Sequence, residues 1–414
     1  MDDIINQGGK LIERVQTKDV HTREVVLYTL SKAIERAAYY GMRGLIVLYM
    51  ISESIGMSHK EALMIYGWFT TALLFSMVMG GFLGDLLIGN KNSIILGGIL
   101  QGVGAFALCI PSSVGIYIGI GLITLGGGLY SPNLNAQFGK LYLNKTKLLD
   151  AGFTILYTSV NVGSFIGVLV MGYLGGINFA LGFIVSGILM FVSIVFPFFI
   201  REKEISNQET NENNIGRNVM YVIIAAVLIG IFWGVYEVGI TGVYELQVGS
   251  SKYTPFLHSI NSCFAITFGI IGCIIWSFFY INRILKIGIG FIIASISFAI
   301  LLLLTENNTD NYVILLIFSG IILSFAEMLI APVFNSIVTK KTNPKYLAIV
   351  FSLVFIPATI FRYLAGIFIS FYYDKPFVNL GFSSVMYGLI GVGLIVTLII
   401  TTRIKLTRSY KNSV

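Results

Sequence analysis

The sequence is poor in charged residues. Of its 414 residues only 11% are Asp, Glu, Lys or Arg, whereas 56% are hydrophobic. A soluble globular domain carries about 25% charged residues, so this composition excludes a soluble domain and predicts an α-helical protein that crosses a membrane several times. The net charge of +7 is interpreted as a mark of membrane orientation and not as a sign of a nucleic-acid partner.

Cysteine and histidine are also scarce. The three cysteines lie in apolar runs without metal-ligand spacing, which predicts reduced packing residues (Cys109, Cys263 and Cys273). The three histidines lie at the ends of predicted spans, which argues against a buried histidine relay (His21, His59 and His258). The chain also has no HExxH or GxSxG motif and no pair of aspartates in facing spans. We therefore expect no enzyme, no metal site and no cofactor.

Long hydrophobic runs are abundant, and a run of roughly 20 residues suffices to cross a bilayer. The fold class predicted from them is an all-α polytopic membrane protein with twelve transmembrane helices, at about 24–51, 60–86, 93–111, 114–138, 150–174, 178–200, 218–246, 254–281, 284–304, 311–339, 345–373 and 378–402. One long polar connection separates six spans from six. The expected divisions are an N-terminal segment (1–23), a first bundle (24–200), a linker (201–217), a second bundle (218–403) and a tail (404–414).

Lysine and arginine are distributed unevenly between the two sides of the predicted bundle. Twenty of the 27 lie in segments on the side of the N-terminus, and only Lys60, Lys252 and Lys375 lie on the other. Positive charge accumulates on the cytoplasmic side of membrane proteins, so both termini are expected in the cytoplasm of a cell with the chain embedded in its inner or plasma membrane. The first residues lack the pattern of a cleavable signal.

Four basic residues remain, and they lie inside predicted spans. In the first span, Lys32, Arg36, Tyr39 and Arg43 are spaced four, three and four apart, and Glu35 lies four before Tyr39. All five therefore fall on one side of a helix. At about 2.5 to 3.5 kcal/mol per charged group, exposing that side to lipid would cost on the order of 10 kcal/mol. We expect it to line a wet cavity or to meet opposite charges on neighbouring helices.

The second half of the chain carries the matching groups: Glu237, Glu327 and Arg362 lie in its predicted spans. Charges contributed by both halves are expected to meet near the midplane between them, where transporters of this build hold their substrates. The alternative is a set of helix-to-helix ion pairs that only stabilise packing. We favour the cavity, because placing seven ionisable groups inside the membrane costs more free energy than helix packing by polar contacts would justify.

A series of short motifs follows along the chain: ERAAYYGMR (35–43), GGFLGDLLIG (80–89), GGGLYSPN (126–133), DAGFTILYTSVNVGSF (150–165), FWGVYE (232–237), HSIN (258–261), SFAEMLIAPV (324–333) and YLAG (363–366). In their order and spacing they resemble the motifs of the proton-dependent oligopeptide transporters, a branch of the major facilitator superfamily. The resemblance implies the major facilitator fold of two six-helix bundles. It also implies that the chain imports short peptides together with protons, by alternating access.

The resemblance further implies roles for individual residues. The substrate-binding group comprises cations for the peptide carboxylate (Arg36 and Arg43), an amine site (Glu327, Asn161 and Asn261) and aromatic walls (Tyr39 and Tyr40). Proton coupling or gating falls to Lys32, Glu35, Glu237 and Arg362. Gly81, Asp85 and Gly89 form a packing loop, in which Asp85 is expected to cap a nearby helix N-terminus. A zwitterion buried away from water needs an opposite charge at each end, which these assignments provide.

Three positions depart from the family pattern. Lys32 stands where the family has a glutamate, Ser131 where it has a lysine, and Arg362 where it has an asparagine. The pattern's four acids and three bases become three acids and four bases, so the cavity is expected to be net positive. Either Lys32 replaces the missing lysine and peptide transport is unchanged, or coupling is rewired and the ligand is more acidic or the function different.

Other functions stay open at this stage. An exporter of the same superfamily is one, and a transporter-derived scaffold that binds a peptide or lipoprotein without moving it is another. Within the transporter hypothesis, Glu237 or Glu327 is expected to carry the proton, because Glu35 lies beside Lys32 and Arg36.

Overall fold

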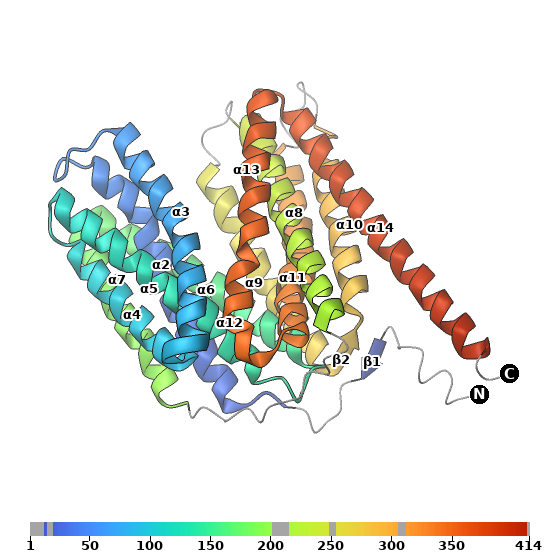
Figure 1. Ribbon diagram of the computed structural model, residues 1–414. Coiled ribbons are helices and arrows are strands. Elements are labelled where there is room, and N and C mark those ends of the chain that lie inside the picture. Colours follow the sequence, from blue (N-terminus) through green and yellow to red (C-terminus); the bar gives the residue numbers. More distant parts are fainter. Residues whose placement is uncertain (1–11, 15–19, 201–214, 248–253, 305–311, 412–414) are drawn as a thin grey trace.

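The computed structural model describes the backbone of residues 12–14, 20–200, 215–247, 254–304 and 312–411. Side chains are described within these ranges except at 12–14, 244–247, 254–262, 312–313, 405–406 and 408–411. In Figure 1 the helices form two groups, one from each half of the chain, standing side by side.

The first half consists of helices that match the predicted spans to within a few residues. They are α2 (Arg23–Ile51), α3 (His59–Leu83), α4 (Asn90–Ala107), α5 (Ser113–Lys140), α6 (Leu149–Ile177) and α7 (Phe179–Phe198). Polar residues start several of them: Ser58, Ser112 and Asn178 each accept a hydrogen bond from a backbone amide of the first turn. The segment Gly84–Ile88 (η1) extends α3 as a π-helix, where the sequence predicts a loop.

The second half consists of α8 (Ile215–Gln247), α9 (Thr254–Phe278), α10 (Arg283–Leu301), α11 (Tyr312–Lys341), α12 (Leu347–Leu353), α13 (Phe355–Phe371) and α14 (Pro376–Lys411). A short 3-10 turn (η3, Pro344–Tyr346) precedes α12. The predicted span 345–373 is thus divided into α12 and α13 at Val354. Proline has no amide hydrogen and its ring conflicts with the carbonyl four residues earlier, so Pro357 accounts for the break beside Leu353.

This arrangement confirms the predicted fold class of a polytopic helical membrane protein. In the described residues, nine helices are long and apolar enough to cross a membrane by length and composition alone. Helix α2 is not one of them, because its charged stripe breaks the hydropathy, although it packs between α6 and α7 inside the first group.

Glycine allows the helices of the first half to approach one another closely. A Cβ on Gly80 of α3 would lie 2.2 Å from the carbonyl oxygen of Gly128 in α5. A Cβ on Gly167 of α6 would lie 2.0 Å from the carbonyl oxygen of Ala37 in α2. Small residues at such contacts are the usual basis of helix packing in membranes, and here they set the position of α2 and its charged groups.

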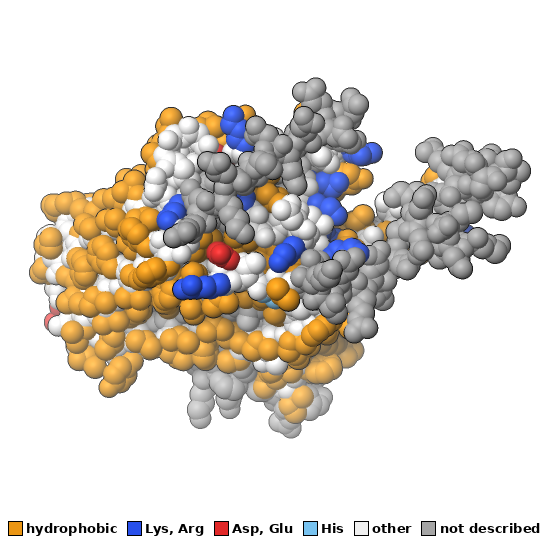
Figure 2. Space-filling model, turned by 90° about the horizontal axis from the view of Figure 1, so that it is seen from below, with side chains coloured by type: hydrophobic (Ala, Val, Ile, Leu, Met, Phe, Trp, Pro, Cys, Tyr) orange, Lys and Arg blue, Asp and Glu red, His pale blue; other side chains and the backbone are white. Residues whose placement is uncertain are grey.

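The two halves meet at one end of the molecule, which we call the closed end. There α12 contacts α3 and α5, and α6 contacts α9 and α11. A small antiparallel sheet that the sequence does not predict lies at the same end and joins β1 (Ile12–Arg14) to β2 (Phe279–Ile281). Strand β1 and the last turns of α14 also lie at this end (Figure 1). Figure 2 views it directly and shows Lys and Arg side chains gathered on this face beside a broad hydrophobic surface.

Candidate functional site

A cavity of about 760 Å³ lies between the two halves. Its walls come from α2, α3, α5 and α6 on one side and from α8, α11 and α13 on the other. The polar residues that line it are Lys32, Arg36, Tyr39, Tyr40, Arg43, Ser131, Asn135, Tyr157, Asn161, Ser164, Glu327, Asn335 and Arg362. Ionisable side chains from both halves therefore share one chamber.

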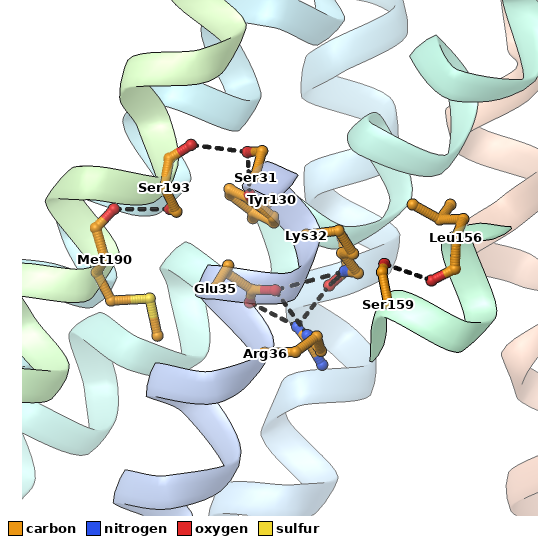
Figure 3. Close-up of polar contacts among 10 residues, drawn as sticks. Ser31, Lys32, Glu35, Arg36, Tyr130, Leu156, Ser159, Met190 and Ser193 are labelled. Atoms are coloured by element: carbon orange, nitrogen blue, oxygen red, sulfur yellow. Dashed lines mark hydrogen bonds and ion pairs between the residues drawn. The ribbon is translucent and has the colours of Figure 1, made fainter. Parts of the chain in front are cut away.

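Helix α2 brings three of its predicted charges together in one cluster (Figure 3). Glu35 is fully buried and does not line the cavity. Arg36 donates to both of its carboxylate oxygens, from Nε and from Nη2, each at 2.6 Å. The Nζ of Lys32 lies 3.5 Å from Glu35 Oε2. Glu35 thus turns away from the chamber that its neighbours on α2 face, and it acts as their counter-ion.

Ser131 of α5 completes this cluster. Its Oγ accepts a hydrogen bond from Lys32 Nζ at 3.1 Å and another from Arg36 Nη2 at 3.0 Å. The Arg36 guanidinium also lies over the rings of Tyr39 and Tyr40, at 4.7 and 5.6 Å from their centroids. These contacts place the cation within cation–π distance of two aromatic rings, which favours arginine here.

Arg43 lies further along the same helix and has a different environment. Its Nε donates to the Tyr66 hydroxyl of α3, and its guanidinium lies 5.4 Å from the centre of that ring. Among the described contacts its partner is therefore a neutral phenol. Tyr66 has no place in the motifs that the sequence presents.

Glu327 is the carboxylate of the opposite wall. It is buried, and its Oε1 accepts a short hydrogen bond from the Tyr157 hydroxyl of α6. Because Tyr157 belongs to the first half, this bond joins the two halves across the cavity. Asn161 lies one turn further along α6, where its Nδ2 donates to the carbonyl oxygen of Tyr157 at 3.1 Å. The backbone of Asn261 is helical, but its side chain lies outside the described residues.

The two remaining predicted coupling residues, Glu237 and Arg362, form a loose ion pair. Arg362 Nε of α13 lies 3.6 Å from Glu237 Oε1 of α8, and the two side chains are 49% and 46% exposed. Arg362 also lies over the ring of Trp233, 5.6 Å from its centroid. Arg362 lines the cavity whereas Glu237 does not.

The Gly/Asp segment lies at the closed end, away from the cavity. Asp85 Oδ2 accepts a hydrogen bond from the amide of Ile349, in the first turn of α12, at 2.9 Å, and its Oδ1 accepts one from Asn90 Nδ2 at 2.8 Å. Gly81 packs so closely on α12 that a Cβ would lie 2.8 Å from the Ala348 carbonyl oxygen. Gly89 has a φ of +83°, which glycine adopts without strain.

A second acidic group at the closed end joins the halves and was not assigned a role from the sequence. Asp150, at the start of α6, is buried and accepts from Arg283 Nε of α10 at 2.7 Å. It also forms an ion pair with Lys286 of the same helix, and Arg283 Nη2 donates to the carbonyl oxygen of Thr146 at 3.0 Å. Both Asp150 and Tyr157 stand inside the DAGFTILYTSVNVGSF motif, so the motif marked the segment without showing which side chains act.

Known proteins similar to this chain were found by three comparisons. Residues 31–360 match the Major Facilitator Superfamily. The uncharacterized transporter YclF of Bacillus subtilis (strain 168) is 31% identical over 232 residues, which are 53% of this chain and 47% of YclF. A di-/tripeptide transporter of Lactococcus lactis subsp. lactis (strain IL1403) is 30% identical over 210 residues, covering 48% of this chain and 42% of the relative. In these matches the chain spans about half the length of its curated relatives.

Solved structures of the same fold cover almost the whole chain. A crystal structure of the peptide transporter POT in complex with sulfate has a TM-score of 0.63 at 23% identity and covers 94% of this chain and 97% of the other. A POT family transporter in complex with 5-aminolevulinic acid has a TM-score of 0.62 at 20% identity, with 92% and 98% covered. The chain therefore belongs to the Major Facilitator Superfamily.

Proposed function

We propose that this protein is a secondary active transporter that imports short peptides together with protons. The observation that carries the proposal is the cavity between the two halves, which has cations on the wall of the first half and the Glu327 carboxylate on the wall of the second. A peptide with free termini presents a carboxylate and an ammonium group, and both require opposite charges when water is removed. The names of the relatives, which include a di-/tripeptide transporter, support the same substrate class.

The proposed roles follow the contacts. Arg36 and Arg43 attract the peptide carboxylate, Glu327 and Asn161 bind the ammonium group, and Tyr39 and Tyr40 pack beside the peptide backbone. Asn261 is kept in the amine site by resemblance alone. No chemical reaction and no cofactor are part of this proposal.

We assign proton carrying to Glu327 in preference to Glu35. Arg36 occupies both oxygens of Glu35, whereas the described partner of Glu327 is the neutral hydroxyl of Tyr157. A carboxylate that binds and releases protons must not be permanently neutralised by a cation, and Glu327 meets this requirement. Glu237 remains the second candidate for carrying the proton. Its ion pair with Arg362 would then form and break as the protein changes state.

Alternating access requires one end of the cavity to be closed while the other is open. The contacts of Asp85 and Asp150 lie at the end where basic residues gather, which we propose is the cytoplasmic end of a protein in the plasma membrane, with both termini on that side. The half-exposed Arg362 then faces the outside. This arrangement corresponds to the state that receives substrate for import.

The experiment is uptake by the purified chain in proteoliposomes. Radiolabelled Ala-Ala, Ala-Glu and Ala-Lys are supplied outside, with or without an inward proton gradient, and counterflow is measured without the gradient. We expect gradient-driven accumulation of at least one peptide, and its loss in Glu327→Gln. The matched control is Glu53→Gln, which removes an exposed carboxylate that does not line the cavity.

Each outcome has a defined meaning. Binding of a peptide without any counterflow would refute transport and support the alternative hypothesis of a peptide-binding scaffold. Uptake that is unchanged in both Glu327→Gln and Glu237→Gln would show that neither carboxylate carries the proton. Absence of both binding and uptake for all three peptides would refute the proposal as a whole.

A further inference from the structure

The first-half wall of the cavity holds more cations than carboxylates. Lys32, Arg36 and Arg43 line it, and Glu35 is the acid that lies among them in the described contacts. Arg36 takes both oxygens of that acid through two hydrogen bonds. Lys32 shares the same carboxylate at 3.5 Å, so the three cations of this wall face one negative charge and two positive charges are left over.

The close partners of Lys32 and Arg43 are neutral hydroxyls. Lys32 Nζ is 3.1 Å from Ser131 Oγ, nearer than the 3.5 Å to Glu35 Oε2. Arg43 donates to the hydroxyl of Tyr66. The Lys32 side chain is only 6% exposed, so bulk water does little to solvate it. A buried cation beside a neutral hydroxyl is incompletely compensated, and an anion that enters the cavity gains the interaction that is missing.

Ser131 is placed to help bind such an anion. Its oxygen already accepts hydrogen bonds from both Lys32 and Arg36. Its own hydrogen is therefore directed away from the two cations, and Ser131 lines the cavity. One ammonium and one hydroxyl donor thus converge on the same part of the chamber, which suits a carboxylate oxygen.

The second-half wall provides one negative charge in return. Glu327 accepts from the neutral Tyr157 hydroxyl, so its charge is not cancelled by a described cation. Arg362 and Glu237 carry opposite charges 3.6 Å apart and cancel one another to a first approximation. The chamber as a whole complements a ligand with two negative groups toward α2 and one positive group toward α11.

We propose that the preferred substrates are peptides whose C-terminal residue is acidic, such as dipeptides that end in glutamate or aspartate. This inference rests on the proposed function of peptide transport. Both carboxylates of such a residue lie at one end of the molecule, where the surplus positive charge of α2 and the Ser131 hydroxyl favour them, while the ammonium group at the other end is directed to Glu327. A peptide with the acidic residue first places its second carboxylate beside its ammonium group, toward Glu327, where like charges repel.

The test compares four dipeptides in the proteoliposome assay: Ala-Glu, its isomer Glu-Ala and the neutral isostere Ala-Gln, which are matched in size, and the smaller Ala-Ala. We expect the half-saturating concentration of Ala-Glu to be about tenfold lower than that of Ala-Gln, the effect of one additional hydrogen bond between charged groups. Glu-Ala is expected to be no better than Ala-Gln. The isomers have the same mass and charge, so a general attraction of anions would not separate them.

Two variants locate the effect. Lys32→Gln keeps a hydrogen-bond donor but removes the charge, and is expected to make Ala-Glu and Ala-Gln equivalent. Lys60→Gln removes an exposed lysine at the start of α3 and is expected to leave the ratio as in the natural chain. If Lys32→Gln no longer transports, thermal shifts with the same four peptides provide the ratio from binding alone.

The outcomes separate this inference from the function on which it rests. Equal half-saturating concentrations for Ala-Glu and Ala-Gln, or for Ala-Glu and Glu-Ala, would overturn the preference while peptide transport stands. A preference that persists unchanged in Lys32→Gln would overturn the assignment to this wall. Failure of all four peptides to bind or enter would overturn peptide transport itself.

Discussion

Replacement of Asp150 by asparagine is expected to open the closed end. Asp150 is buried between Arg283 and Lys286 of the opposite half, with side chains that are 8% and 2% exposed. Loss of the carboxylate leaves two buried cations without a counter-ion. Removal of one partner from a buried ion pair costs about 3–5 kcal/mol.

This cost falls on the closed state, because separation of the halves lets water reach both cations. At 25 °C, 3 kcal/mol corresponds to a change of about 150-fold in the ratio of closed to open molecules, and 5 kcal/mol to several thousand-fold. Even if the natural protein strongly favours the state in which this end is closed, that preference would be lost or reversed in the variant. We expect Asp150→Asn to populate the alternative state in which the cavity faces the other side.

The assay is thiol alkylation at the closed end. Ser352 of α12 is fully buried where Gly81 of α3 packs against it, so Ser352→Cys is a near-isosteric reporter once Cys109, Cys263 and Cys273 are replaced by serine. The rate of alkylation by N-ethylmaleimide should rise strongly when Asp150→Asn is added.

Two controls accompany this measurement. Glu61→Gln removes an exposed carboxylate at the start of α3 and should leave the alkylation rate unchanged. Addition of Arg283→Gln and Lys286→Gln to Asp150→Asn removes the uncompensated charges and should slow alkylation again. An unchanged rate in Asp150→Asn, or a triple variant as reactive as the single one, would refute the reasoning.

Two further predictions concern the packing of the same molecule. His21 contacts the Tyr142 hydroxyl through Nδ1 at 2.8 Å and Ser277 Oγ through Nε2 at 3.1 Å, and burial, together with a nearby lysine, lowers its pKa below the ordinary value of 6.5. A lowered pKa means that the unfolded chain binds the proton more readily, so this contribution to stability is complete above pH 6.5 and is lost as the pH falls below it. The melting temperature should therefore depend less on pH between 5 and 7 in His21→Gln, and an identical pH dependence would contradict this. In the second prediction, Gly80→Ala is expected to lower stability by about 1–3 kcal/mol, because its Cβ would lie 2.2 Å from the Gly128 carbonyl oxygen. Gly67→Ala in the same helix meets nothing within 4 Å and should be neutral or stabilising, so equal melting temperatures for the two variants would refute the close-packing argument.

Several features of the site were visible in the sequence because they depend on local periodicity. The spacing of Lys32, Arg36, Tyr39 and Arg43 places them on one side of a helix, and these four side chains do line the cavity. Glu35 shares that side by the same reasoning, yet it turns inward to Arg36. Helical spacing shows only that residues share one side of the helix, a sector about half a turn wide. Whether a side chain within that sector faces the cavity or the packed interior depends on where the neighbouring helices lie.

Other contacts had no signal in the sequence at all. Nothing in the spacing of residues indicates that Tyr157 meets Glu327, 170 positions away, or that Asp150 meets Arg283. The break between α12 and α13 is an intermediate case, since Pro357 was visible but a proline inside a span does not by itself show whether the helix bends or stops.

The sequence by itself determined that this chain is a helical membrane protein with charges held inside its spans, because the hydrophobic effect and the cost of burying charge act on each segment separately. Its motifs also pointed to the superfamily to which the chain belongs. Only the tertiary structure decided which charges neutralise one another, which of them face the cavity and which end of the molecule is closed. Those outcomes depend on how each helix is rotated about its axis and on how the two halves meet, and a linear pattern of residues records neither.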